Sequence, residues 1–170
     1  VDCNDCEAVK LLLECGADVN APTAAMITPL MTAAGHGNKE ITRLLIHSGA
    51  EINARTNCCS TALMYAADRG HAEIAELLIN RGADINAQTD YCATALMSAA
   101  EKGHIEIVRL FVDKGADANL YDKCRTIALM KAAAAGHAGI VNLLAARCAN
   151  IDTKDREGRS ALMAAVENGH

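Results

Sequence analysis

Eight cysteines and six histidines are the residues of this 170-residue chain best suited to bind a metal or attack a substrate. Cys3 and Cys6 have the Cys-x-x-Cys spacing of zinc ligands and redox pairs. Zinc would need two further ligands, and the one nearby candidate, Cys15, has no partner motif beside it. We therefore predict no metal and no other cofactor.

Four more cysteines, Cys58, Cys59, Cys92 and Cys124, lie in polar links between apolar segments. Cys59 and Cys92 are 33 residues apart and take equivalent places in a repeat. One helix spacing, roughly 8–10 Å, should separate them, whereas a disulfide needs Cα atoms within about 7 Å. We expect free thiols and a cytoplasmic location, where thiols stay reduced.

Catalytic arrangements are equally scarce. His36 and His47 have no plausible nucleophile or carboxylate placed with them. The glycines close helices and form no phosphate-binding loop. We predict no catalytic residue, and the chain is not expected to be an enzyme.

The position of every residue is governed by a repeat of 33 residues without insertion or deletion. Gly16-Ala17-Asp18-Val19-Asn20 returns three times nearly unchanged and once in a worn form, Cys148-Ala149-Asn150-Ile151-Asp152. A Thr-x-Leu-Met marker keeps the same step, from Thr28-Pro29-Leu30-Met31 to Ser160-Ala161-Leu162-Met163. A Gly-His pair does so too, at residues 70–71, 103–104, 136–137 and 169–170.

These three markers resemble the signature of the ankyrin repeat over essentially the whole chain. The resemblance implies a mainly α fold, an ankyrin-repeat solenoid of helix-turn-helix pairs joined by β-hairpin fingers. It also implies a structural role for the four histidines of the Gly-His pairs. The predicted array covers residues 1–170. Residues 1–20 are the second half of a repeat, 21–53, 54–86, 87–119 and 120–152 are full repeats, and 153–170 are a first half.

The residues themselves explain this local structure. A Thr or Ser before each first helix can accept hydrogen bonds from free backbone N–H groups, and the glycine after it can adopt the left-handed conformation that ends a helix. Apolar residues recur at helical spacing in the second helix, expected over residues 71–79 in one repeat. Alanine pairs such as Ala66-Ala67 permit close stacking, and each repeat buries its apolar face only against its neighbours.

The sequence also departs from the family pattern. Met stands at all five places where the family has His, and we expect these methionines only to fill space. The fingertip glycine survives only at Gly158; Met26, Cys59, Cys92 and Arg125 replace it. Either those fingers are strained or their backbone differs.

The ends and the charge complete the description. Val9, Leu11, Leu12 and Leu13 carry no polar compromise, so we expect a monomer or a segment of a longer repeat protein. The net charge of −5 argues against nucleic acid as a partner. Residues 1–122 hold 9 basic and 17 acidic residues and residues 123–170 hold 7 and 4, so an acidic body ends in a basic part. No apolar run is long enough for membrane insertion.

The function that remains is binding another protein, as a scaffold or adaptor. In ankyrin proteins the partner usually meets the fingertips and the first helices, which line the concave face. The alternatives are a regulatory or targeting segment of a larger enzyme or channel, and a structural spacer. The residues at the matching variable positions are Asn57, Cys58, Ser60, Tyr65, Asp68, Arg69, Asp90, Tyr91, Ser98, Glu101, Lys102, Lys123, Arg125 and Lys131.

Two of these residues are aromatic, and aromatic side chains are frequent binding hot spots. Tyr65 and Tyr91 belong to adjacent repeats, and Lys123, Arg125 and Lys131 form a basic edge. The sequence therefore predicts a partner with an apolar anchor, docking near the two tyrosines, and an acidic flank.

Overall fold

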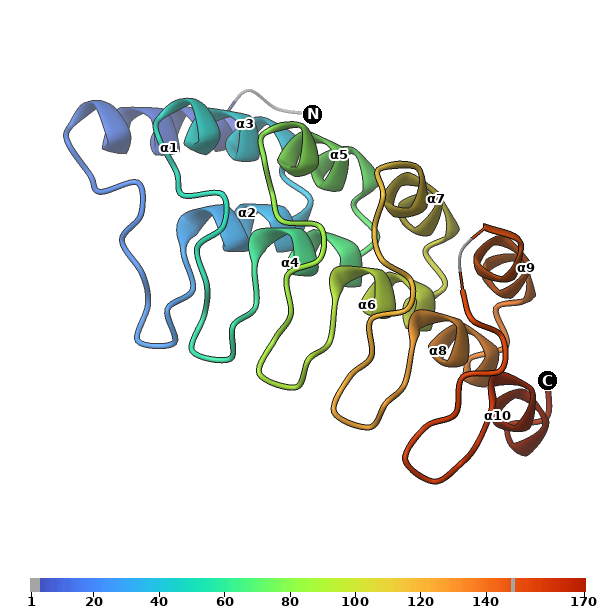
Figure 1. The fold of residues 1–170 in the computed structure, drawn as a ribbon. Coiled ribbons are helices and arrows are strands. Elements are labelled where there is room, and N and C mark those ends of the chain that lie inside the picture. Colours follow the sequence, from blue (N-terminus) through green and yellow to red (C-terminus); the bar gives the residue numbers. More distant parts are fainter. Residues whose placement is uncertain (1–3, 148) are drawn as a thin grey trace. The chain divides into compact units, whose positions relative to one another are not determined.

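The structure, a computed structural model, describes residues 4–147 and 149–170 (Figure 1). These residues form ten α-helices and no strand, which confirms the mainly α prediction. The predicted β-hairpin fingers are tight turns to which no strand is assigned. The helices are α1 (Asn4–Glu14), α2 (Pro29–His36), α3 (Lys39–His47), α4 (Ala62–Asp68), α5 (Ala72–Asn80), α6 (Ala95–Lys102), α7 (Ile105–Asp113), α8 (Ala128–Ala134), α9 (Ala138–Arg147) and α10 (Ala161–Glu167).

The chain divides into two compact units, Val1–Asp84 and Ile85–His170. In the first unit α2 packs on α3 and α4 on α5, and these pairs stack through α2 against α4 and α3 against α5. In the second unit α6 packs on α7 and α8 on α9, with α8 between α6 and α10. Within each unit the first helices of the pairs lie in one row and the second helices in another (Figure 1). The repeat boundaries given above remain a prediction.

The core consists of small and aliphatic side chains at the same place in successive repeats. Leu63 and Leu96 are 1% exposed, and so are their equivalents Leu30 and Leu129. The alanine pairs that follow them on the first helices are buried as well. Because alanine adds only a methyl group, neighbouring helices can approach closely enough to exclude water with few large side chains.

Helix starts are capped as the sequence predicts. The side chains of Thr28, Thr61, Thr94 and Ser160 accept from the backbone N–H three residues later, at 3.3–3.4 Å. At the equivalent position of α8, the buried Ile127 offers no such cap. The second helix α5 begins at Ala72, one residue later than expected, because His71 is its N-cap residue.

The expectation that methionine only fills space is wrong for Met31. Its sulfur accepts from the backbone N–H of Thr28 at 3.5 Å, while the Thr28 hydroxyl accepts from the N–H of Met31. The two bonds form a reciprocal cap in which a thioether takes the place usually held by a Glu or Gln side chain.

The Gly-His pairs join one repeat to the next. Nε2 of His71 donates to the carbonyl oxygen of Gly35 at 3.2 Å, and Nε2 of His137 donates to that of Glu101 at 3.0 Å. The imidazole ring lies over the glycine that ends the preceding first helix. A Cβ atom on Gly103 would come within 2.7 Å of the His137 ring.

Asparagine forms a second connection between repeats. The side-chain oxygen of each motif Asn accepts from a backbone N–H of the next repeat at 2.8–2.9 Å. The pairs are Asn20 with Glu51, Asn53 with Asp84, Asn86 with Asp117 and Asn119 with Asn150. The fourth residue of each pair's motif therefore needs no side chain of its own for this bond, since the backbone donates.

We predict that Gly103→Ala destabilises the protein more than Gly115→Ala. Both glycines have φ near 80°, at 82° and 83°, so both substitutions carry the same backbone cost. That cost is about 1 kcal/mol. A methyl group at residue 115 meets nothing within 4 Å, whereas one at residue 103 overlaps the His137 ring, which adds about 1–3 kcal/mol.

Urea unfolding of the two variants and of the wild type measures the difference. Adding His137→Ala to Gly103→Ala should cost less than the sum of the two single changes, because the overlap is gone. Equal losses for Gly103→Ala and Gly115→Ala would show that the ring does not restrict this position.

Candidate protein-binding surface

Five fingers, residues 23–27, 56–60, 89–93, 122–126 and 155–159, connect the repeats and share one construction. The first residue of each finger, Thr or Asp, accepts through its side chain from the backbone N–H of the fifth at 2.9–3.2 Å. Its own N–H donates to the carbonyl of the fifth residue, and its carbonyl accepts from the N–H of the fourth. The finger is thus closed by its own first residue.

The fourth residue of every finger is in the left-handed region. Met26, Cys59, Cys92 and Arg125 have φ of 60–61°, and Gly158 has φ of 78°. Of the two alternatives left open by the sequence, strain is the correct one. A side chain at such a φ costs roughly 1–2 kcal/mol.

Backbone hydrogen bonds link neighbouring fingers within each unit. The N–H of Asn57 donates to Ala25 O at 3.2 Å in the first unit. In the second unit the N–H of Lys123 donates to Tyr91 O at 2.9 Å and that of Arg156 to Cys124 O at 3.0 Å. The fingers of a unit therefore hold one another in register and present their exposed side chains at fixed positions.

In the first unit, the predicted site residues lie on finger 56–60 and on α4. Asn57 is tied to the neighbouring finger, since its Nδ2 donates to Ala24 O at 3.2 Å. Cys58 is exposed, and Ser60 is half-buried at the base. Tyr65 is half-buried against Gly35. Asp68 and Arg69, at the end of α4, form an ion pair of 3.5 Å.

In the second unit, the predicted residues lie on two fingers and on α6 and α8. Lys123 Nζ lies 5.3 Å from the centre of the Tyr91 ring, within the range of a cation–π contact. Tyr91 nevertheless stays 67% exposed. Asp90, Lys102 and Arg125 are exposed, and Ser98 is half-buried on α6. Tyr65 and Tyr91 belong to different units, so their proposed joint anchor remains a hypothesis.

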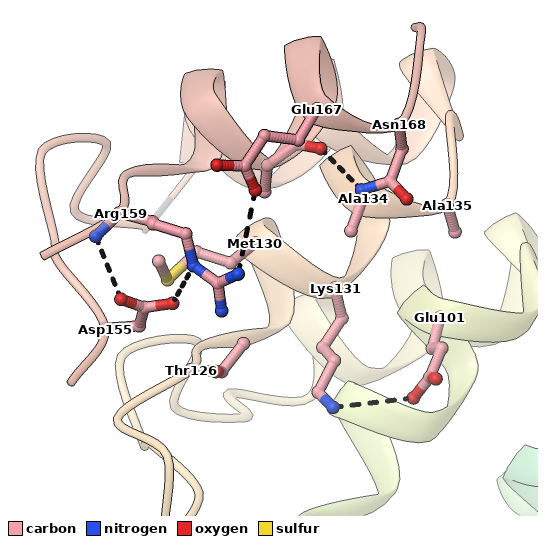
Figure 2. A pocket seen from close by; sticks show the side chains of 11 residues that line it. Glu101, Thr126, Met130, Lys131, Ala134, Ala135, Asp155, Arg159, Glu167 and Asn168 are labelled. Atoms are coloured by element: carbon pink, nitrogen blue, oxygen red, sulfur yellow. Dashed lines mark hydrogen bonds and ion pairs between the residues drawn. The ribbon is translucent and has the colours of Figure 1, made fainter. Parts of the chain in front are cut away.

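Lys131 and Glu101 lie at one side of a cleft of about 370 Å³ in the second unit (Figure 2). Lys131 Nζ is 3.8 Å from Glu101 Oε2 and 3.5 Å from Asp122 Oδ2. The floor is formed by small or flexible apolar groups, Met130, Ala134, Ala135 and Ala164. Asp155, Arg159, Glu167 and Asn168 form the other side.

Arg159 joins the last finger to α10 across this cleft. Its Nε donates to Asp155 Oδ2 at 2.9 Å, and its Nη1 lies 3.4 Å from Glu157 and 3.6 Å from Glu167. The backbone N–H of Arg159 holds the pKa of Asp155 below its ordinary 3.8, and the guanidinium adds to this effect although burial opposes it. The Asp155 side chain raises the pKa of Arg159 in return. Both groups remain charged at neutral pH, so the cleft offers fixed charges and no acid or base for catalysis.

Metal and thiol chemistry were also examined residue by residue. Within residues 4–147 and 149–170, no three His, Cys, Asp or Glu side chains are placed to hold a metal ion. Cys6, Cys15, Cys58, Cys59, Cys92 and Cys124 have free thiols. Cys3 and Cys148 lie outside the described residues, so the prediction of eight free thiols stays open for them. In the same described ranges, no helix is long and apolar enough to cross a membrane.

Sequence reasoning missed half of the cleft. Asp155, Arg159 and Glu167 were not selected because the list of variable positions ended at Lys131. The signal was present: residue 155 is one repeat after Asp122, and both close their fingers with a carboxylate where earlier fingers use Thr.

The comparison with known families agrees with this architecture. The family model described as ankyrin repeats in three copies matches residues 1–89, 55–122 and 96–170. The chain therefore belongs to the ankyrin-repeat family. Ankyrin repeats are in general protein–protein interaction modules. Among individual curated proteins, no significant sequence match was found.

We predict that Arg125→Gly stabilises the protein by about 0.5–1 kcal/mol, because glycine relieves the left-handed strain while adding entropy to the unfolded chain. Arg125 is exposed, so little packing is lost. Cys124→Gly, one residue earlier and without a positive φ, is the matched control and should not stabilise. Thermal unfolding measures both, and a lower melting temperature for Arg125→Gly would contradict the assignment of strain.

A second prediction concerns acid. Because the pKa of Asp155 is lowered on folding, its stabilising contribution is complete above the unfolded pKa and is lost as the pH falls through the lower, folded pKa. Asp155→Asn should thus destabilise at neutral pH, and the difference from wild type should shrink below about pH 4. Urea unfolding over a pH series measures this, with Asp90→Asn, an exposed fingertip carboxylate, as control. A difference that does not change with pH would contradict a role for the charge.

Proposed function

We propose that the chain binds another protein through its fingers and first helices, as a scaffold or adaptor. The observation that carries the proposal is a division of labour along each repeat. The residues that recur every 33 positions are buried or hydrogen-bonded to a neighbouring repeat. The residues that vary lie on fingers held in register, with many side chains exposed.

Tyr91 is the best candidate for the apolar anchor of this surface. It is exposed, and its ring is already oriented by Lys123 and by the backbone bond between their fingers. A side chain held in place loses less conformational entropy on binding. Tyr65 is less suitable as a test site, because it also packs on Gly35.

The charge of the surface supports an acidic flank on the partner, at a different place from the one expected. Lys131 is engaged by Asp122 and Glu101, so it serves the cleft first. Arg125 and Arg156 are exposed at the tips of adjacent fingers, and neither forms an ion pair with another described residue. Together with Lys123 they form a basic fingertip row, defined by these three residues, and an acidic segment of the partner would lie along it.

We predict that Tyr91→Ala weakens binding at least about 30-fold, or about 2 kcal/mol, because an aromatic hot spot is lost. Lys123→Glu with Arg156→Glu should mainly slow association and reduce its dependence on salt. Arg109→Ala, on the exposed side of the second helix α7, is the control and should bind normally.

The experiment is affinity capture from an extract of the source cells, followed by binding kinetics with the captured protein. Wild type and Arg109→Ala should retain the same partner, and the Tyr91→Ala and charge-reversed variants should lose it. Circular dichroism confirms folding of each variant. Normal binding by both finger variants with loss of binding by Arg109→Ala would place the partner on the second helices and refute the proposal.

A further inference from the structure

Two apolar faces of the chain stay uncovered in the structure, one on α1 and one on α10. Leu12 on α1 is 61% exposed, although its equivalents Leu45, Leu78, Phe111 and Leu144 are at most 3% exposed. Leu162 on α10 is 74% exposed, whereas its equivalents are 1% exposed. The α1 face consists of Ala8, Leu11 and Leu12; the α10 face consists of Val141, Ile151, Leu162 and Val166.

The α10 face borders a cleft of about 650 Å³ between α8, α9 and α10. One repeat earlier, the corresponding place beside α6, α7 and α8 is filled by α9, which packs on both α7 and α8. α9 buries Ile140 and Leu144 there. The cleft on α10 thus has the shape of a second helix of the repeat.

The helix α1 is such a second helix. It packs on α3 as α7 packs on α9, and it has no first helix against it among the described residues. In repeat register, Cys6 corresponds to Ala138, the first residue of α9, and His170 corresponds to His137, the residue just before it. The two uncovered halves therefore meet end to end without a gap in register.

Side-chain volumes point to α1 itself as the occupant, and to no arbitrary helix. α8 and α9 are joined by three residues and pack on each other, so residues equally distant from the turn lie opposite, Ala133 with Ile140 and Leu129 with Leu144. In all four complete pairs the first combination is Ala with Ile. On the uncovered faces it is Val166 with Ala8: the first helix has gained volume, and the second has lost it.

We propose that copies of this chain associate head to tail, with the α1 face of one copy packed in the α10 face of the next. Leu12 then lies opposite Leu162 and Ala8 opposite Val166, which completes one repeat from two chains. The interface is heterologous, because it joins two different faces, so each added copy offers a new free face. Asp152 replaces the Asn of the motif and still offers an oxygen to the backbone N–H of Asp18 in the adjoining copy.

Charge has little part in this contact. Within the chain, ion pairs join consecutive second helices, Lys39 to Glu73 and Arg147 to Asp113. The residues corresponding to these pairs across the proposed interface are Ala138 with Glu7 and Ala146 with Cys15. We therefore expect the association to be almost independent of salt, unlike binding along the basic fingertip row.

Sedimentation velocity on the purified chain, from low to high micromolar concentration, tests the proposal. Wild type should form dimers and larger species as the concentration rises. Leu12→Asp and Leu162→Asp each destroy one face and should be monomeric, with association weakened at least about 30-fold. An equimolar mixture of the two should form dimers and nothing larger, because only one pair of intact faces remains. Tyr121→Asp, which removes another exposed apolar side chain, is the control and should behave as wild type.

A compensating pair tests the volume argument directly. Ala8→Ile should weaken association by overpacking against Val166, and Val166→Ala should weaken it by leaving a gap, each by about tenfold. The two changes together should restore it. All four positions are exposed, so the variants should fold, and circular dichroism checks this.

Three results would overturn the proposal. Wild type could stay monomeric at every concentration, which would leave both faces to a helix of another protein or of a longer chain. Either Asp variant could still dimerise alone, which would mean an interface between identical faces. Alternatively, high salt could dissolve the association, which would assign it to charge.

Discussion

Hydrogen bonds from one repeat to the backbone of the next set the geometry of everything else in this chain. Asn side chains accept from the following repeat, and His rings donate to the preceding one. Both bonds join a side chain to a backbone group at a fixed offset, so an insertion or deletion inside a repeat would break them together. This explains why the step of 33 residues never varies, while the residues between the bonds change freely.

The same bonds explain which residues the chain cannot exchange. A glycine must end the first helix because the next repeat's imidazole occupies the space of a Cβ atom. Elsewhere a local device can be replaced, as Thr is by Ile127 at a helix start and by Asp155 at the base of a finger. The framework is thus maintained where repeats touch, and it is permissive where a repeat touches only itself.

Most of this framework could be predicted from the sequence, because it is periodic. The helices, the caps at Thr28 and Thr94 and the left-handed strain at Cys92 all follow from residues that recur in register. The cleft could not be predicted, since it depends on how Arg159 reaches Asp155 and Glu167 on two different elements. The sulfur bond of Met31 was missed for another reason: methionine is a weak acceptor that rarely decides a structure. The sequence placed Lys131 on the binding surface, but only coordinates show that carboxylates already engage it.

The joints between repeats have a consequence for how such a chain can grow or shrink over evolutionary time. Each complete repeat offers an Asn acceptor at one end and a His donor at the other, and it asks for the same two partners. Unequal recombination that removes or duplicates 33 codons therefore leaves no joint unsatisfied, wherever in the gene it begins. Length becomes a property that can change in whole steps without refolding the neighbours, while a change of any other size is eliminated at once.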